Sequence, residues 1–208
     1  MSKNLFSLKA LGLAALLCAS AAANADITVY TSEAAFNAAV ANRGVDTFDD
    51  LPLGSLSDTL DRSAGSYTYT ASAANGLWGA GVPGDTWLST NLRTDSVVFS
   101  NFSGHVSAFG GNFFGTDIGG AYVPGGDLIL TATDGFSLTY SLNGTTQSSF
   151  LGFVSDSDLG SVTLTSNGNS TLWPTANNVV LAVPEPTTYG MLLAGLGCVT
   201  VMARRRRS

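Results

Sequence analysis

The fold class follows from residues 128–144, which read Leu128-Ile129-Leu130-Thr131-Ala132-Thr133-Asp134-Gly135-Phe136-Ser137-Leu138-Thr139-Tyr140-Ser141-Leu142-Asn143-Gly144. One apolar series alternates with Ile129, Thr131 and Thr133, and it consists of Leu128, Leu130 and Ala132. A second alternates with Ser137, Thr139 and Ser141, and it consists of Phe136, Leu138, Tyr140 and Leu142. A period of two is typical of a strand with one buried face. Asn143-Gly144 precedes another such run and predicts a type I′ hairpin turn.

Working outward from this segment, the same alternation or β-rich composition predicts further strands at 27–30, 67–71, 96–101, 106–109, 148–154, 162–165 and 178–183. One helix is predicted over residues 33–41, with Ser32 as its N-cap and Glu33 in its first turn. Residues 51–66 are predicted to be the least structured part. Many short strands, glycine-rich turns and a single N-terminal helix predict a mainly β fold, an antiparallel β-sandwich that is jelly-roll-like.

The N-terminus has the features of a secretory signal peptide over residues 1–25. Lys3 and Lys9 precede an apolar run at 10–23, and Ala23-Asn24-Ala25 supplies the small residues that signal peptidase favours. Cleavage is therefore expected between Ala25 and Asp26. Leu17 before Cys18 is too large for a lipoprotein signal. The other cysteine, Cys198, lies near the C-terminus, so the mature domain is expected to fold without a disulfide.

The mature domain, residues 26–182, is acidic and poor in charge. It contains fourteen Asp and Glu residues against three arginines, Arg43, Arg62 and Arg93, which leaves eleven negative charges in excess. Such a balance disfavours binding to nucleic acid or to anionic lipid headgroups. Charged residues make up 12% of the whole chain, about half the usual share. The surface must therefore be built largely from Ser, Thr, Asn and Gly.

The C-terminal segment, residues 183–208, has three consecutive parts. Val183-Pro184-Glu185-Pro186 is followed by an uncharged apolar run at 187–203 and then by Arg204, Arg205, Arg206 and Arg207. A helix over that run would be roughly 25 Å long, at the low end of what a bilayer core needs. Because basic residues beside a spanning helix stay in the cytoplasm, this topology places the mature domain outside.

This three-part tail resembles the PEP-CTERM sorting tail of Gram-negative bacteria, which is read by exosortase, a membrane-embedded cysteine transpeptidase. The resemblance implies that Pro184, Glu185 and Pro186 form the recognition element of a substrate and are not catalytic. It also implies an inner-membrane-anchored precursor and a final place at the cell surface or outside the cell, in an exopolysaccharide setting. The same tail region is also known under an "ice-binding protein C-terminal" label.

The mature domain resembles the secreted sandwich domains that accompany such tails. Three segments carry this resemblance. Phe48-Asp49-Asp50-Leu51-Pro52 resembles an early "F-D/E" segment, Phe150-Leu151-Gly152-Phe153 an "F-x-G-F" strand, and Asn177-Asn178-Val179 a closing "D-N-V" strand. In this chain Asn177 stands where the closing motif begins with Asp.

Catalytic machinery is sparse in this sequence, so we expect no enzyme. His105 is the single histidine, there is no Gly-x-Ser-x-Gly segment, and the mature domain has no thiol. A lone histidine in a strand-like run is more often a surface residue than a base. A glycosidase needs only two carboxylates, so a glycan-acting enzyme stays a lesser alternative.

Three groups of residues are candidate binding sites. Calcium takes loop carboxylates and amide oxygens, and its candidate ligands are Asp49, Asp50 and Asn178, with solvated acids as the alternative. Aromatic faces stack on sugar rings, which makes Trp78 and Trp87, ahead of Trp173, candidates for carbohydrate binding, with core packing as the alternative. Flat rows of threonine occur on ice-binding faces, and the chain has three T-x-T pairs: Thr68/Thr70, Thr131/Thr133 and Thr163/Thr165.

The sequence therefore predicts an exported cell-envelope or extracellular-matrix protein with a structural or adhesive role. A carbohydrate-binding module is the alternative, and a glycan-acting enzyme or an ice-binding protein is less favoured. The partners expected are signal peptidase, exosortase and an exopolysaccharide. No cofactor is expected apart from calcium.

Overall fold

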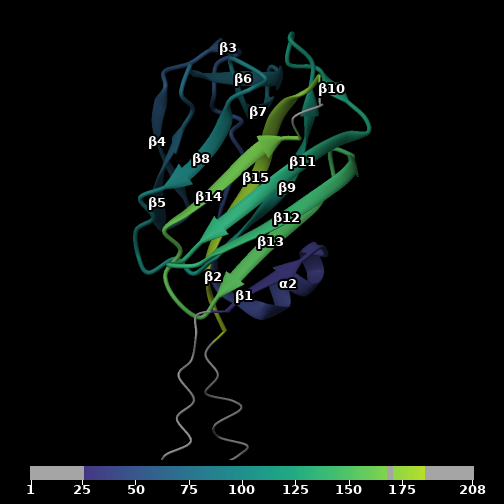
Figure 1. Cartoon of the computed structure of the whole chain (residues 1–208). Helices are drawn as coiled ribbons and strands as arrows, with labels where there is room; N and C mark the ends of the chain where they lie inside the picture. Colours follow the sequence, from purple (N-terminus) through teal and green to yellow (C-terminus); the bar gives the residue numbers. More distant parts are fainter. Residues whose placement is uncertain (1–25, 168–170, 186–208) are drawn as a thin grey trace, which may run out of the picture.

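The computed structural model of the protein describes residues 26–167 and 171–185 (Figure 1). The predicted signal peptide, the predicted spanning helix at 187–203 and the arginine cluster lie outside the described residues. Within the described ranges, no helix is long and apolar enough to cross a membrane.

The described chain forms two antiparallel sheets and one short helix, α2 (Glu33–Ala39). The larger sheet has nine strands: β1 (Ile27–Tyr30), β2 (Val40–Asp46), β3 (Gly54–Ser55), β6 (Leu77–Val82), β7 (Asp85–Thr90), β9 (Ala108–Thr116), β10 (Tyr122–Val123), β13 (Phe150–Ser155) and β15 (Trp173–Pro184). The smaller sheet has six: β4 (Thr59–Ala64), β5 (Tyr67–Ser72), β8 (Ser96–Ser100), β11 (Gly126–Thr133), β12 (Ser137–Thr145) and β14 (Ser161–Ser166).

Eight of these strands follow the order of a jelly roll. The larger sheet contains the run β7-β15-β9-β13, and the smaller contains β8-β14-β11-β12. With the short β10 left aside, the chain changes sheet at each step between these eight strands except at the β11–β12 hairpin, which gives two Greek keys. The mainly β, antiparallel prediction is confirmed. The remaining strands extend the edges of both sheets.

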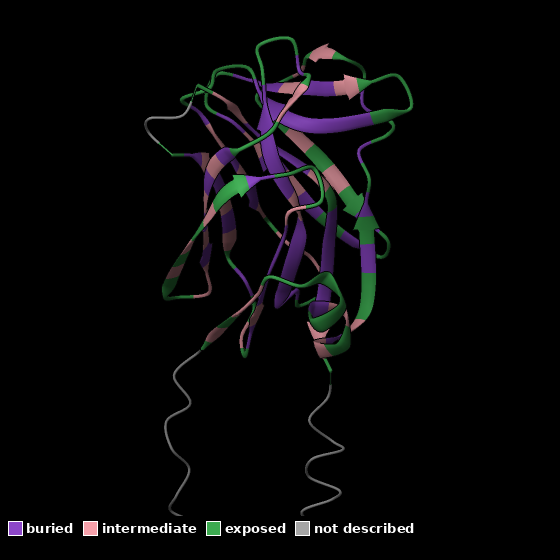
Figure 2. Cartoon of the chain, turned by 90° about the vertical axis from the view of Figure 1, so that its right-hand side faces the viewer, coloured by how far each residue is buried: buried purple, intermediate pink, exposed green. Residues whose placement is uncertain are grey.

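The core lies between the two sheets and is built from the alternation seen in the sequence. Leu128, Leu130 and Ala132 of β11 face inward from the smaller sheet, and Phe109 and Phe113 of β9 face them from the larger sheet. All five side chains are fully buried, and Figure 2 shows the buried strands running through the middle of the molecule. Apolar burial on this scale stabilises the fold without a disulfide.

The predicted hairpin turn at Asn143-Gly144 is wrong. Both residues belong to β12, where Gly144 has a φ of +62° and its N–H donates to Asp127 Oδ1 at 2.9 Å. The ladder to β11 shifts register at this point, so the pair forms a bulge. The turn that joins β11 to β12 is Asp134-Gly135-Phe136, which leaves Phe136 exposed instead of continuing the buried series.

Helix α2 is shorter than predicted because the chain enters β2 at Val40. Ser32 caps it as predicted, with its Oγ accepting from the Ala35 N–H at 3.4 Å. Phe36 is the one residue of the helix that is fully buried, and it packs on paired glycines of the larger sheet, Gly110 and Gly152. A Cβ at Gly152 would lie 2.4 Å from the Phe36 ring, so only glycine admits the helix here.

Residues 51–66, predicted to be the least structured part, contain β3 and β4, and β4 pairs with β5 along its whole length. Strands β6 and β7 were also missed. Gly79 and Gly81 interrupt the pattern of β6, and β7 is buried on both faces from Thr86 to Thr90, so neither strand shows alternation.

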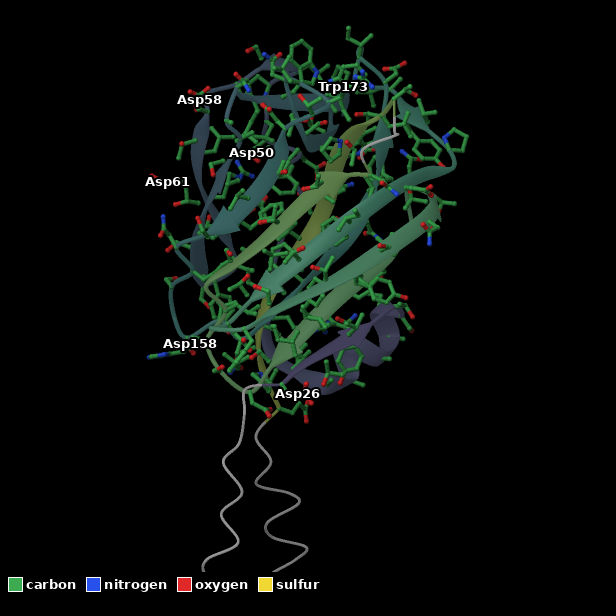
Figure 3. The ribbon with its side chains drawn as sticks, in the orientation of Figure 1. Asp26, Asp50, Asp58, Asp61, Asp158 and Trp173 are labelled. Atoms are coloured by element: carbon green, nitrogen blue, oxygen red, sulfur yellow. The ribbon has the colours of Figure 1, made fainter. Side chains whose placement is uncertain are left out.

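The two ends of the described chain lie at one end of the sandwich, which we call the base. Asp26 leads into β1, and β15 ends against β2, both beside α2 (Figure 1). Trp173, at the start of β15, lies at the opposite end, which we call the far end (Figure 3). The β6–β7 hairpin and β10 also lie there.

Candidate functional site

The last strand runs into the predicted sorting motif without a linker. Strand β15 continues to Pro184, which is paired with Val40 of β2. The N–H of the exposed Glu185 donates to the carbonyl oxygen of Ala39, at the end of α2, at 3.1 Å. Two residues of the predicted motif are therefore held against the base of the fold.

A charged cluster joins the two sheets near the first predicted motif of the domain. Arg62 of β4 donates to both carboxylate oxygens of Asp46, at 2.9 and 2.7 Å, and to both of Asp50, at 2.8 and 2.6 Å. The buried hydroxyl of Tyr69 donates to Asp46 Oδ2 at 2.7 Å. The guanidinium also lies over the ring of the buried Phe48, 5.4 Å from its centroid.

The electrostatics of this cluster follow from its geometry. Hydrogen bonds from Arg62 lower the pKa of Asp50 below its ordinary value of 3.8. The same bonds, together with those to Asp46, raise the pKa of Arg62. Burial raises the pKa of Tyr69, and the neighbouring Asp46 carboxylate raises it further. Arg62 and Tyr69 therefore keep their protons, and the cluster acts as a clamp between sheets and not as a proton-transfer site.

The predicted calcium ligands have other surroundings in the structure. Asp50 is bound in bidentate fashion by Arg62, a cation that would repel calcium. Asn178 has a φ of +49° at a bulge of β15, and its Nδ2 donates to Asn112 Oδ1 at 3.4 Å. Asp49 is exposed. Among the residues that the structure describes, no group of three or more His, Cys, Asp or Glu could hold a metal ion. The calcium site stays a prediction.

The tryptophans separate into one that packs and two that border a pocket. Trp87 is buried on the outer face of the larger sheet, edge-on to Phe114 with ring centroids 5.0 Å apart, and its Nε1 donates to Asp85 at 2.8 Å. Trp78 of β6 and Trp173 of β15 are half-buried and line a common pocket of about 150 Å³ at the far end. The sequence favours Trp87 over Trp173 as a carbohydrate-binding candidate because it does not reveal that β15 lies beside β7.

Polar groups complete this pocket. Ser89 and Thr90 of β7 line it, together with Asn91, Asp117 and Ile118. The indole Nε1 of Trp173 donates to the carbonyl oxygen of Asn91 at 3.2 Å, which fixes the orientation of that ring. Asp117 Oδ1 accepts from the N–H groups of Gly119 and Ala121, at 2.8 and 2.9 Å. These bonds hold the pocket's aromatic and acidic groups in place, which reduces the ordering that binding would require.

The three T-x-T pairs all lie on the outer face of the smaller sheet. Thr131 pairs directly with Thr163, and Thr131 Oγ1 lies 2.9 Å from Thr139 Oγ1. Thr70 of β5 pairs with Ser100 of β8, and β8 is separated from β11 by β14. Val98 of β8 stands between the two groups of threonines, so the face is rich in Ser and Thr but is not an unbroken threonine array. Strand spacing alone could not reveal this gathering, because it depends on sheet order.

His105 lies on the surface. Its side chain is 88% exposed, and its Nδ1 lies 2.8 Å from Asp158 Oδ2. Asp158 and Asp26 lie at the base (Figure 3), far from the pocket.

Comparison with known proteins decides the nature of the tail. A family model described as the PEP-CTERM protein-sorting motif matches residues 182–207. The chain carries a PEP-CTERM sorting motif. Its presence indicates an exported protein that transits the membrane on its way to the cell envelope, with exosortase as the processing partner. No curated protein and no solved structure gives a match.

The matched PEP-CTERM segment overlaps the fold. It begins at Ala182, and β15 ends at Pro184, so the first three matched residues are strand residues. The sorting signal and the domain therefore share part of one strand.

Proposed function

We propose that this protein is a non-enzymatic structural or adhesive domain of the Gram-negative cell surface. A helix over residues 187–203 anchors its precursor in the inner membrane, and Arg204 to Arg207 stay in the cytoplasm. Exosortase then processes the tail, and the mature domain, beginning at Asp26, takes its place in an exopolysaccharide matrix.

The observation that carries this proposal is the position of the sorting motif relative to the fold. Strand β15 delivers the motif at the base, the same end of the sandwich at which β1 begins. A domain tethered there presents its far end outward, away from the membrane. This arrangement suits display and contact with extracellular material.

The surface chemistry supports an adhesive role in a polysaccharide setting. The outer face of the smaller sheet carries rows of hydroxyl groups, among them the bonded pairs Thr131–Thr139 and Ser96–Thr165. Hydroxyl groups both donate and accept hydrogen bonds, as do those of a glycan. Hydrogen bonds between these hydroxyl groups and a neutral glycan need no charged patch on the protein.

The pocket supports the non-enzymatic part of the proposal. Asp117 is the single carboxylate among its lining residues. Glycoside hydrolysis uses a pair of carboxylates on either side of the scissile bond. The alternative function, a carbohydrate-binding module, is favoured by the same pocket because Trp78 and Trp173 border it.

The proposal is tested by following the full-length chain in an exosortase-bearing Gram-negative host, with an epitope inserted after the exposed Phe136. Two hosts are compared, one with its exopolysaccharide and one unable to make it. We expect mature protein in the matrix fraction of the first host and in the culture medium of the second. Equal retention in both hosts would contradict a role in the exopolysaccharide matrix.

A further inference from the structure

We propose that the far-end pocket binds one uncharged pyranose unit, presented as the end of a glycan chain. This inference adds a ligand class to the proposed function, and its test does not depend on tail processing. It rests on the size of the pocket, its two indole rings, its fixed polar groups and its charge.

Size limits the ligand to one ring. The pocket measures about 150 Å³, whereas sites for drug-sized ligands measure roughly 300–1,000 Å³. An oligosaccharide would extend beyond such a volume, but a terminal sugar would fill it. Ile118, which is 78% exposed, stands at its rim and can contact the next unit of the chain.

The indoles provide the apolar contact. Trp78 and Trp173 come from β6 and β15, strands that are brought together by β7 between them. The bond from Trp173 Nε1 to Asn91 O holds one edge of that ring. The C–H groups of a pyranose can pack on a ring face that is held in this way.

Acceptors for sugar hydroxyls lie beside the rings. Asp117 uses Oδ1 to bind its own turn, and no hydrogen bond within the described ranges uses its Oδ2. The Asn91 side chain is positioned by Nδ2, which donates to Asn75 O at 3.2 Å, and no bond in the described part of the chain engages its Oδ1. Two pre-positioned acceptors match two donor hydroxyls of one ring.

Charge selects between sugars. Asp117 is acidic, and the described domain is strongly acidic as a whole. A uronate or sulfated sugar would bring its negative charge against this carboxylate, which costs binding free energy in a partly desolvated site. The pocket therefore favours neutral hexoses over their anionic counterparts.

The test uses the signal-cleaved full chain, purified in a detergent without a sugar headgroup. Tryptophan fluorescence is titrated with the methyl glycosides of glucose, galactose, mannose and N-acetylglucosamine, and with glucuronate. A single ring is expected to bind with a Kd on the order of 1 mM. We expect saturable binding of at least one neutral glycoside, at least tenfold tighter than glucuronate.

Variants locate the binding. Trp173→Ala should weaken it at least tenfold, and Asp117→Asn, which keeps the Oδ1 acceptor of the turn, should weaken it about fivefold and reduce discrimination against glucuronate. Trp87→Phe is the matched control because Trp87 packs outside the pocket, and it should bind as the wild type does. No saturation by any neutral glycoside, or unchanged binding in both pocket variants, would overturn the inference.

A second inference rests on a different observation, the seam between the sorting motif and the fold. Beyond Ala182, β15 is held on one side only, because its pairing with β9 ends there while its pairing with β2 continues through Val183 and Pro184. A register shift between Leu181 and Val183 separates these last pairs from the rest of the β2 ladder. The end of β15 is therefore a short segment that can detach from β2 while the rest of the sheet stays paired.

From this we infer that residues 183–185 must detach from β2 before exosortase can engage the motif. An enzyme that reads Pro184 and Glu185 needs their backbone free, and in the folded domain Glu185 donates to Ala39 O. The predicted membrane helix begins at Thr187, only two residues after Glu185. The prediction therefore leaves no linker that could bring the motif to the enzyme while β15 stays paired. Opening of this seam thus controls the rate of processing.

A disulfide across the seam tests this inference, which rests on the proposed processing. Ala41 and Val183 are partners across the two strands, so Ala41→Cys with Val183→Cys should lock it. The matched control, Thr131→Cys with Thr139→Cys, forms a similar cross-strand pair on the smaller sheet. Processing is followed by pulse-chase in the host that matures the wild type.

The locked variant should mature at least tenfold more slowly than the wild type, and the control pair at the wild-type rate. In cells that do not oxidise periplasmic thiols, the locked variant should recover. If the wild type matures and the locked variant, with its disulfide verified, matures equally fast, the seam inference is overturned. Absence of maturation in the wild type itself would instead contradict the proposed processing.

Discussion

The two ends of one sheet face differ in how their aromatic residues are covered. At the base, Phe36 of α2 seals a cluster that also holds Phe150 and Val180. At the far end, Trp87 and Phe114 form a second cluster on the same outer face, but the flanking Trp78 stays half-buried beside a pocket. The base has a helix and the paired glycines that receive Phe36, whereas no helix among the described residues covers the cluster at the far end.

This difference separates stability from binding. A sealed cluster contributes free energy of folding and offers no surface to a ligand. A partly open one contributes less to folding and presents rings to the solvent. The face thus has a structural end, where the tail begins, and a candidate recognition end, which lies opposite the tail.

The largest expected contrast comes from truncating one aromatic residue at each end. Phe36→Ala removes a fully buried ring that contacts Phe150 at a centroid distance of 5.4 Å, and it should cost about 3–5 kcal/mol of stability. Trp173→Ala removes a half-buried ring at the pocket and should cost about 1 kcal/mol. Urea denaturation of both variants, followed by circular dichroism, measures the two costs. Equal losses would remove the distinction between the ends.

A smaller loss is expected from the clamp that joins the sheets between these ends. Arg62→Ala leaves the buried carboxylate of Asp46 with Tyr69 and a backbone N–H as its donors, and it should cost about 2–3 kcal/mol. Arg62→Lys keeps the positive charge but cannot bind both carboxylates in bidentate fashion, so it should recover only part of the lost stability. Full recovery by lysine in the same denaturation assay would show that geometry is unimportant here.

The smallest effect concerns pH. The folded pKa of Asp50 lies below its ordinary value of 3.8 because Arg62 binds the ionised form. Its contribution to stability is therefore present above that ordinary value and is lost as the pH falls through the lowered folded pKa. Asp50→Asn should melt below the wild type at pH 7, and the gap should narrow below about pH 4. A gap that is constant between pH 7 and pH 3 would contradict the clamp.

Local alternation was enough to predict the sandwich. The runs at Leu128–Ala132 and Val162–Leu164 face the core as predicted, because alternation is a property of the strand itself. The Asn143-Gly144 bulge was mistaken for a turn because the same dipeptide serves both, and the choice depends on which strand lies opposite. Strands β6 and β7 gave no signal since one is interrupted by glycine and the other is buried on both faces.

The candidate sites depended on the tertiary arrangement, and here sequence reasoning reached less far. Trp78 was predicted for carbohydrate binding and lines the pocket, but Trp87 packs in a cluster and Trp173 takes its place. Nothing local joins Trp173 to Asn91, which lies more than eighty positions earlier in the chain. Likewise, the sequence did not reveal that Asp50 is bound by Arg62, which lies twelve positions later, on β4.

The sorting motif carries the proposed function, and one measurement tests its role most directly. Pro184, Glu185 and Pro186 are replaced together by alanine, which leaves residues 187–203 and the four arginines unchanged. Intact-mass spectrometry then compares this variant with the wild type in the exosortase-bearing host. We expect the wild type at a mass that lacks the tail, and the variant in the membrane fraction at the full mass of residues 26–208. A variant that reaches the surface with its tail removed, as fast as the wild type, would contradict the account.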